Sequence, residues 1–175
     1  MTAPYPSSLS SFKIAQMKTG PESLTLRQVD AGDNNFLLQL YQSSRGDDLR
    51  GLGWEEDRIS EFLKMQYEAQ RNLLDNDYPN LTDQIVFLDG APVGRLAVEH
   101  RPDEVRLVDV ALLTEYRNRN IGTHLIQQLQ EQAAAAKLPL RLQVIRFNRA
   151  ISLFERLGFS RTSETGTHFQ MEWTG

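Results

Sequence analysis

Residues 104–137, "EVRLVDVALLTEYRNRNIGTHLIQQLQEQAAAAK", are the most informative part of the chain about its fold, because their residue pattern changes twice. The stretch begins as the most continuously apolar run of the chain, which is typical of a central strand covered on both faces. It ends with apolar residues at helical spacing: Ile121, Leu125, Ile126, Leu129 and Ala133. A second apolar run, "LPLRLQVI" (residues 138–145), follows this helix. The pattern predicts a strand–helix–strand crossover over about residues 105–145.

The polar loop between the predicted strand and helix has the chemistry of an anion site. A helix N-terminus presents unpaired N–H groups and the positive end of the helix dipole. Gly122 lets a ligand approach the backbone closely, and Asn120 tolerates left-handed backbone angles. Arg117 and Arg119 add positive charge, and Thr123 adds a hydroxyl. A solvated helix start with basic residues explains the local chemistry equally well. The loop lacks the Gly-Lys-Ser/Thr ending of a P-loop and the several glycines of a dinucleotide site.

The remaining segments predict an α/β fold with a mixed, mostly antiparallel sheet. "SLTLRQV" (23–29) alternates as a strand does, and Asp89-Gly90 joins two strands within residues 84–100. We expect helices over 33–44, with Asp33 or Asn34 as the cap, over 54–76 and over 149–158, with "RGDDLRGLG" (45–53) as a loop. "FSRTS" and "HFQMEW" form a closing pair of strands. Residues 1–22 are expected to be an arm, and residues 23–175 a single domain.

Composition excludes several classes of protein. The formal charge of −4 argues against sequence-independent nucleic-acid binding. No apolar run is long enough to span a bilayer, and the N-terminus lacks a secretory signal pattern. The absence of cysteine excludes disulfides, thiolate metal sites and cysteine nucleophiles. His100, His124 and His168 are scattered and lack metal-ligand spacing, so we expect no metal. These features favour a cytoplasmic protein.

Two motifs in this order resemble those of the GCN5-related N-acetyltransferases (GNAT family). Arg117, Asn120 and Gly122 fall at the positions of that family's Arg/Gln-x-x-Gly-x-Gly/Ala motif, with Asn in place of the first glycine. About 30 residues on, "NRAISLFERLGF" looks like the family's second block. The resemblance covers residues 23–173 and implies a GNAT-like sheet of about six or seven strands flanked by about four helices.

The resemblance also implies an activity and a cofactor site. Such enzymes move an acetyl group from acetyl-CoA directly to an amine of a small molecule or a protein, through a ternary complex. The pyrophosphate of coenzyme A would lie on the loop, and the pantetheine arm would pair with the central strand like an added strand. The implied cofactor-binding residues are Val110, Ala111, Leu112, Arg117, Asn118, Arg119, Asn120, Ile121, Gly122, Thr123, Asn148 and Phe154.

The chain departs from the family at two catalytic positions. Phe154 occupies the place of the tyrosine that commonly protonates the leaving thiolate, and Gln143 stands where some relatives carry a glutamate base. A non-catalytic module that binds or senses acyl-CoA is therefore the alternative function. Asp109 is the only charged residue within "LVDVALL" (107–113), and it is our candidate base, acting directly or through water.

Structural interpretations stand beside the functional ones. Asp109 could equally form a salt bridge to Arg95 or Arg141, and Glu99 is a weaker candidate base. The segment between the first two helices often borders the acceptor site in such enzymes, so Arg45, Asp48 and Trp54 are candidates for the substrate pocket. Capping and packing would explain them as well. The helix over 54–76 either covers the sheet or takes part in a homodimer interface.

Overall fold

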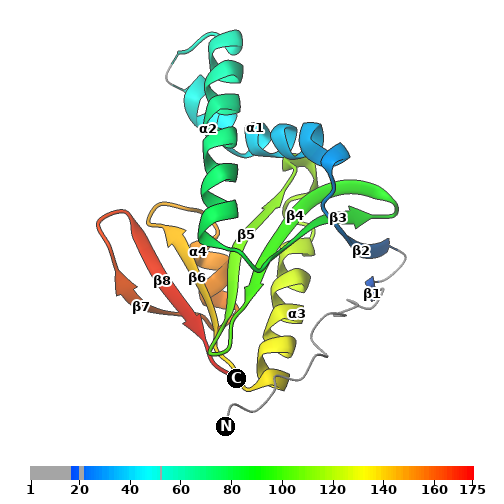
Figure 1. Cartoon of the computed structure of the whole chain (residues 1–175), viewed down its shortest axis with the longest axis vertical. Helices are drawn as coiled ribbons and strands as arrows, with labels where there is room; N and C mark the ends of the chain where they lie inside the picture. Colours follow the sequence, from blue (N-terminus) through cyan, green and yellow to red (C-terminus); the bar gives the residue numbers. More distant parts are fainter. Residues whose placement is uncertain (1–16, 20–21, 52) are drawn as a thin grey trace.

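The computed structural model describes residues 17–19, 22–51 and 53–175 of the chain. Its described strands form one eight-stranded sheet, and the only parallel neighbours in it are β5 and β6 (Figure 1). In spatial order they are β1 (Met17–Thr19), β2 (Glu22–Gln28), β3 (Leu81–Leu88), β4 (Ala91–His100), β5 (Val105–Leu112), β6 (Leu140–Ile145), β8 (His168–Trp173) and β7 (Ser160–Glu164). The predicted mixed, mostly antiparallel sheet is confirmed. The predicted arm lies mostly outside the described residues, and its Met17–Thr19 segment pairs with β2.

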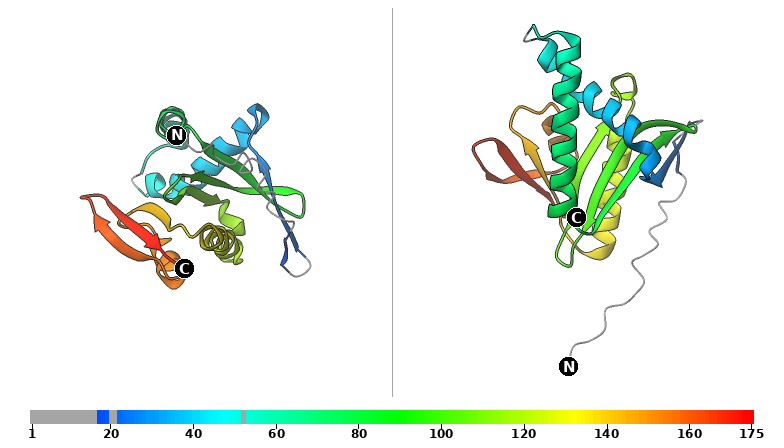
Figure 2. Two further views of the ribbon diagram at one scale, coloured as in Figure 1. Left: turned by 60° about the horizontal axis from the view of Figure 1, so that its bottom comes forward. Right: turned by 45° about the horizontal axis from the view of Figure 1, so that its top comes forward.

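Two helix layers cover the sheet. The helices of the described residues are α1 (Asn34–Arg50), α2 (Glu56–Asp77), α3 (Ile121–Ala136) and α4 (Ile151–Arg156). Figure 2 shows α1 and α2 on one face of the sheet and α3 and α4 on the other. The α3 helix carries the chain from β5 to the parallel strand β6, so the predicted crossover is confirmed. Among the described helices, none combines the length and the apolar character that a membrane span requires.

The main hydrophobic core lies between the sheet and the α3–α4 layer. All five residues of the predicted apolar face of α3 are buried, and Leu125, Ile126 and Ala133 have no exposed surface. They pack with the sheet residues Leu96, Leu107 and others. A second, smaller core of Leu37, Tyr67 and Ile85 lies under α1 and α2. The first core fixes the strand–loop–helix segment that carries the predicted anion site.

The structure corrects the sequence prediction in the first helical region. Residues 45–50, predicted as loop, continue α1 to Arg50. Gly46 is the only strong helix breaker among these six residues, and it is buried where α1 faces Ile59 and Leu63 of α2, so tertiary packing outweighs its low helix propensity. The predicted cap also shifts, because Asp30 caps a short 3-10 turn, Ala31–Asp33, that precedes α1.

A bulge in β5 decides which of its side chains face the α1–α2 layer. Ala97 of β4 pairs with Asp109, but the next residue, Val98, pairs with Leu107, so Val108 is an extra residue on β5. Before the bulge, Leu107 packs into the core on the α3 face. After it, Val110 packs against that core instead, and Asp109 turns to the α1–α2 face. Without the bulge the Asp109 carboxylate would point into the hydrophobic core.

The strands β5 and β6 separate soon after they meet. Their pairing covers only Val105–Leu107 with Leu140–Leu142, whereas β5 runs on to Leu112 and β6 to Ile145 (Figure 1). Beyond the separation, β8 is the only described strand that pairs with β6. The end of β5 that leads into the polar loop therefore has one backbone edge without a neighbouring strand.

Candidate active site

The loop before α3 has the backbone geometry of an anion site. Asn118 and Asn120 both have positive φ values, 59° and 62°, as the residue type of Asn120 predicted. This turn directs the chain into α3, where the first-turn N–H groups of Ile121, Gly122 and Thr123 have no acceptor within the helix. A Cβ at Gly122 would have Leu153 Cδ2, at 3.7 Å, as its nearest protein contact outside its own helix turn, so the space beyond this glycine is open to a ligand.

The open edge of β5 leads to this loop. Leu113 donates its N–H to Val93 of β4, so odd-numbered residues of this segment turn their backbone groups toward β4. The backbone N–H and C=O groups of Val110 and Leu112 consequently point to the open edge, whereas the backbone groups of Ala111 face β4. The Arg117 side chain donates from Nε to the Leu112 carbonyl at 3.0 Å and so links the loop to the strand.

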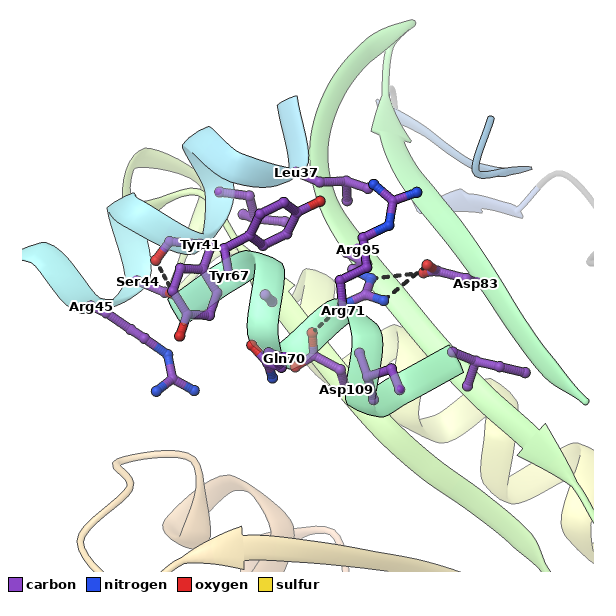
Figure 3. A pocket seen from close by; sticks show the side chains of 14 residues that line it. Leu37, Tyr41, Ser44, Arg45, Tyr67, Gln70, Arg71, Asp83, Arg95 and Asp109 are labelled. Carbon is purple, nitrogen blue, oxygen red and sulfur yellow. Dashed lines mark hydrogen bonds and ion pairs between the residues drawn. The ribbon is translucent and has the colours of Figure 1, made fainter. Parts of the chain in front are cut away.

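A pocket lies between the sheet and the α1–α2 layer, at the bulge of β5 (Figure 3). The helices contribute Tyr41, Ser44, Arg45, Tyr67, Gln70 and Arg71, and the sheet contributes Asp83, Arg95, Asp109 and Ala111. The rings of Tyr41 and Tyr67 are in tilted contact, with centroids 5.7 Å apart. Because Asp109 and Ala111 line it, the pocket lies next to the segment of β5 that has the open edge.

An ion-pair network on three adjacent strands forms the floor of this pocket. Arg95 donates from Nε and Nη2 to the two carboxylate oxygens of Asp83, at 2.7 and 2.9 Å. Its third nitrogen, Nη1, donates to Asp109 Oδ2 at 3.1 Å. Of the two partners considered for Asp109, the structure has Arg95, because Arg141 pairs with Glu104 and Glu172.

The surroundings of Asp109 make it a stronger proton acceptor than an ordinary aspartate. Removal from water raises its pKa above the usual range, and the positive charge of Arg95 opposes part of this increase. About a third of the side chain, 34%, remains exposed to the pocket. The carboxylate is therefore both perturbed and accessible, which is the combination that a general base requires.

The predicted substrate residues separate in the structure. Arg45 lines the pocket and stacks on Tyr41, with 4.8 Å between the guanidinium carbon and the ring centroid. The Asp48 side chain lies outside the described part of the structure. Trp54 packs on the first turns of α2, edge-on to Phe62 and beneath Arg58, and is absent from the pocket lining. Packing therefore accounts for Trp54.

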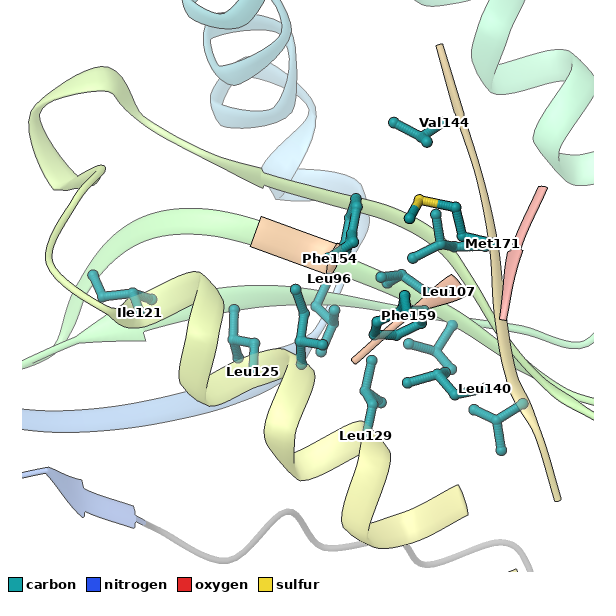
Figure 4. Packing of buried hydrophobic residues seen from close by; sticks show 14 of the residues in the cluster. Leu96, Leu107, Ile121, Leu125, Leu129, Leu140, Val144, Phe154, Phe159 and Met171 are labelled. Carbon is teal, nitrogen blue, oxygen red and sulfur yellow. The ribbon is translucent and has the colours of Figure 1, made fainter. Parts of the chain in front are cut away.

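Three further candidates have structural contacts. Glu99 is 3% exposed, pairs with Arg101 and does not line the pocket. The Asn148 carboxamide oxygen accepts the Ala150 N–H at 2.8 Å and so caps the turn before α4. Phe154 is 4% exposed and packs edge-on against Phe159, within the core cluster of Figure 4.

Residues 37–159 match the acetyltransferase (GNAT) family. The chain belongs to this family. The matched region runs from within α1 to Phe159, the residue before β7, so it includes the open edge of β5, the loop and the pocket lining. No curated protein matches the chain in sequence.

Solved structures share the fold along most of the chain. The PaiA N-acetyltransferase of Thermoplasma acidophilum, in complex with coenzyme A, has 20% identity and a TM-score of 0.67, covering 87% of this chain and 99% of its own. An acetyltransferase from Thermus thermophilus has 20% identity and a TM-score of 0.61, covering 87% and 97%. The Escherichia coli ribosomal-protein-S18-alanine N-acetyltransferase has 17% identity and a TM-score of 0.59, covering 86% and 93%. At these identities the likeness establishes the GNAT fold.

Sequence reasoning missed several residues of the pocket. Tyr41 and Tyr67 lie among other apolar positions of their helices, and nothing in the sequence indicates that they face a pocket rather than the core. Asp83 was not considered, although it is a charged residue just before an apolar strand. Within the described residues, no group of three His, Asp or Glu side chains is arranged to hold a metal ion.

Proposed function

We propose that the protein transfers an acetyl group from acetyl-CoA to an amine acceptor within a ternary complex, with no covalent enzyme intermediate. The observation that carries this proposal is the continuity of one backbone segment. The unpaired edge of β5, at Val110 and Leu112, connects the loop of residues 118–123 at one end with the Asp109 pocket at the other. A long ligand with an anionic end and a reactive end fits this arrangement.

The chain's own groups fit coenzyme A in the following way. The N–H groups of residues 118–123 would bind the pyrophosphate at the positive end of α3. The carbonyl of Val110 and the N–H of Leu112 would pair with the pantetheine amides as a neighbouring strand does. Leu112 keeps its carbonyl for Arg117. The two arginines of the loop, Arg117 and Arg119, add positive charge near the phosphates.

The predicted cofactor residues have different roles in this proposal. Ala111 acts by lining the pocket, because its backbone groups face β4. Asn148 shapes the turn before α4, and Phe154 packs below the site. Phe154 has no proton to donate, so the thiolate leaves as an anion or takes a proton from water, which is feasible for a thiol with a pKa near 8.5.

The acceptor amine must be neutral when it attacks. Acetyl-CoA supplies the activated acetyl group as a thioester. Asp109 would accept the proton of the amine, and the raised pKa of Asp109 makes its carboxylate a stronger base than that of an ordinary aspartate. A backbone N–H of the open β5 edge would donate to the thioester oxygen, where negative charge develops. The acceptor would lie in the pocket among Tyr41, Arg45 and Tyr67.

Release of free thiol from acetyl-CoA tests the proposal. A panel of small aliphatic amines, arylamines and peptides with free N-termini is offered as acceptor, and mass spectrometry identifies the acetylated product. We expect amine-dependent thiol release with at least one class. Tight coenzyme A binding without turnover of any amine would contradict the enzyme and leave the acyl-CoA-binding module. Cytoplasmic location and homodimer formation remain separate predictions, tested by fractionation and by light scattering.

A further inference from the structure

The floor of the pocket contains two further charged residues, Asp83 and Arg95, beside the candidate base Asp109. Asp83, Arg95 and Asp109 come from β3, β4 and β5, and their meeting depends on the register of the sheet. Ala97 stands directly opposite both Asp83 and Asp109, and Arg95 is the next residue of β4 on the same face. Arg95 is therefore the diagonal neighbour of both carboxylates. It is also well buried, with 13% of its side chain exposed.

Arg95 binds its two carboxylate partners unequally, with two hydrogen bonds to Asp83 and one to Asp109. Asp83 binds Arg95 with both oxygens, which fixes the plane of the guanidinium and leaves Nη1 pointing at Asp109. Asp109 receives one hydrogen bond, on Oδ2. Within the described structure, Asp109 Oδ1 stays available to the pocket. Arg95 therefore holds the Asp109 carboxylate by Oδ2, while Oδ1 faces the pocket.

We propose that Asp83 and Arg95 are positioning residues for acetyl transfer: Asp83 fixes the Arg95 guanidinium, and Arg95 holds Asp109 ionised with one oxygen directed into the pocket. The inference rests on the proposed function for its catalytic meaning. In the step it supports, the acceptor nitrogen forms the C–N bond as the C–S bond breaks. The electron pair stays on sulfur, and Asp109 takes the nitrogen's proton and releases it to solvent.

The electrostatic effects of the two residues on Asp109 oppose each other. Arg95 lowers the pKa of Asp109, because its positive charge favours the carboxylate, and Asp83 raises it, because its negative charge does the opposite. Both act on a group whose pKa burial raises above the ordinary range. The charged and titratable side chains that share the pocket with Asp109 are Tyr41 and Arg45 of α1, Tyr67 and Arg71 of α2, Asp83 of β3 and Arg95 of β4.

Because Arg95 and Asp83 affect the pKa of Asp109 in opposite directions, removing each charge in turn should shift the Asp109 titration in opposite directions. Carbon-detected NMR of the aspartate carboxyl groups follows Asp109 in the free protein, and Asp109→Asn assigns its signal. We expect Arg95→Gln to move the Asp109 titration to higher pH and Asp83→Asn to move it to lower pH. Glu172→Gln is the matched control, since it removes a carboxylate from an arginine pair of the same sheet outside the pocket. We expect it to leave the Asp109 titration unchanged.

The rate of acetyl transfer is then measured against pH with the best amine of the panel. We expect the acidic limb of kcat/KM, which reports groups of the free enzyme, to follow the NMR titration, and the rate of Arg95→Gln at pH 7 to fall by roughly tenfold or more. A purely structural role would lower the melting temperature of the variants without moving the limb or the titration, and this result overturns the inference. If the NMR titrations shift as expected while the acidic limb stays in place, the coupling holds but Asp109 is not the base, which overturns the positioning role. The titration needs no turnover, so its failure is separable from failure of the proposed function.

Discussion

The Arg117 side chain donates to the carbonyl oxygen of Leu112 at 3.0 Å, and this bond joins the polar loop to the last residue of β5. The loop presents N–H groups at the start of α3, and β5 presents an unpaired backbone edge. One side chain therefore links the two surfaces that we assign to coenzyme A. Arg117 has a structural role here in addition to its charge.

This bond predicts the effect of removing Arg117. In Arg117→Ala the loop loses its tie to β5, and we expect coenzyme A affinity to fall by roughly fivefold, the equivalent of about 1 kcal/mol. Arg119→Ala is the matched control in the same loop, because the Arg119 guanidinium lies over the Tyr116 ring instead. Calorimetry should find a smaller loss for Arg119→Ala. Equal losses would indicate that both arginines act only through charge.

Gly94 of β4 is a second determinant of the open edge. A Cβ at this position would lie 2.4 Å from the Ala111 carbonyl oxygen and 2.6 Å from Leu112 Cδ2, so Gly94→Ala must displace β5. We expect a loss of about 1–3 kcal/mol in the free energy of unfolding, measured by urea denaturation, together with weaker coenzyme A binding. Gly166→Ala is the control, because a Cβ there has no atom of the described residues within 4 Å outside its immediate chain neighbours. Wild-type stability in Gly94→Ala would show that β5 does not depend on this contact.

The role of Asp109 is tested by Asp109→Asn, which keeps the side-chain shape and removes the charge. If Asp109 is the base, kcat should fall by roughly a hundredfold or more, and coenzyme A affinity should stay unchanged. If Asp109 is only the ion-pair partner of Arg95, the melting temperature should fall and kcat should not. Measuring all three quantities on one preparation separates these outcomes.

We expect protonation of Glu104 to lower the stability of the fold at acidic pH. Burial alone would raise its pKa, but hydrogen bonds from Arg106 and Arg141 outweigh this and hold the pKa below its ordinary value. The folded protein therefore releases this proton more readily than the unfolded chain does. The stabilisation is complete above the unfolded pKa of about 4.3 and is lost as the pH falls through the folded pKa.

Melting curves between about pH 3 and 7 measure this dependence. We expect the wild type to lose stability below about pH 4, and Glu104→Gln to show less of this acid dependence. The same substitution should cost about 1–3 kcal/mol at pH 7, because Arg101, Arg106 and Arg141 lose the buried carboxylate that accepts their hydrogen bonds. If the melting temperatures of the two proteins fell equally with decreasing pH, Glu104 would not contribute to the acid dependence of stability.

The sequence predicted the parts of the fold that local chemistry controls. The apolar face of α3 follows from residue spacing, and the turn at Asp89-Gly90, where both residues have positive φ, follows from residue type. The end of α1 was mispredicted, because burial of Gly46 against α2 is a tertiary effect. The bulge at Val108 was also hidden, since neighbouring apolar residues fit either face of a covered strand.

The candidate site was predictable to a similar extent. The left-handed turn at Asn120 and the open start of α3 could be inferred from the loop itself. The network of Asp83, Arg95 and Asp109 could not, because it depends on the register of three strands. Sequence reasoning offered Arg95 and Arg141 equally as partners of Asp109, and only the pairing of β4 with β5 distinguishes them.

Calorimetry of coenzyme A binding to Gly122→Val tests whether the N–H groups of residues 118–123 bind the pyrophosphate. Among the described residues, Leu153 Cδ2, at 3.7 Å, is the nearest contact outside its own helix turn for a Cβ at this position, so the variant should fold and melt like the wild type. Its side chain would occupy the approach to the N–H groups of residues 118–123. We predict a loss of coenzyme A affinity of at least about tenfold. Wild-type affinity in the folded variant would contradict the account.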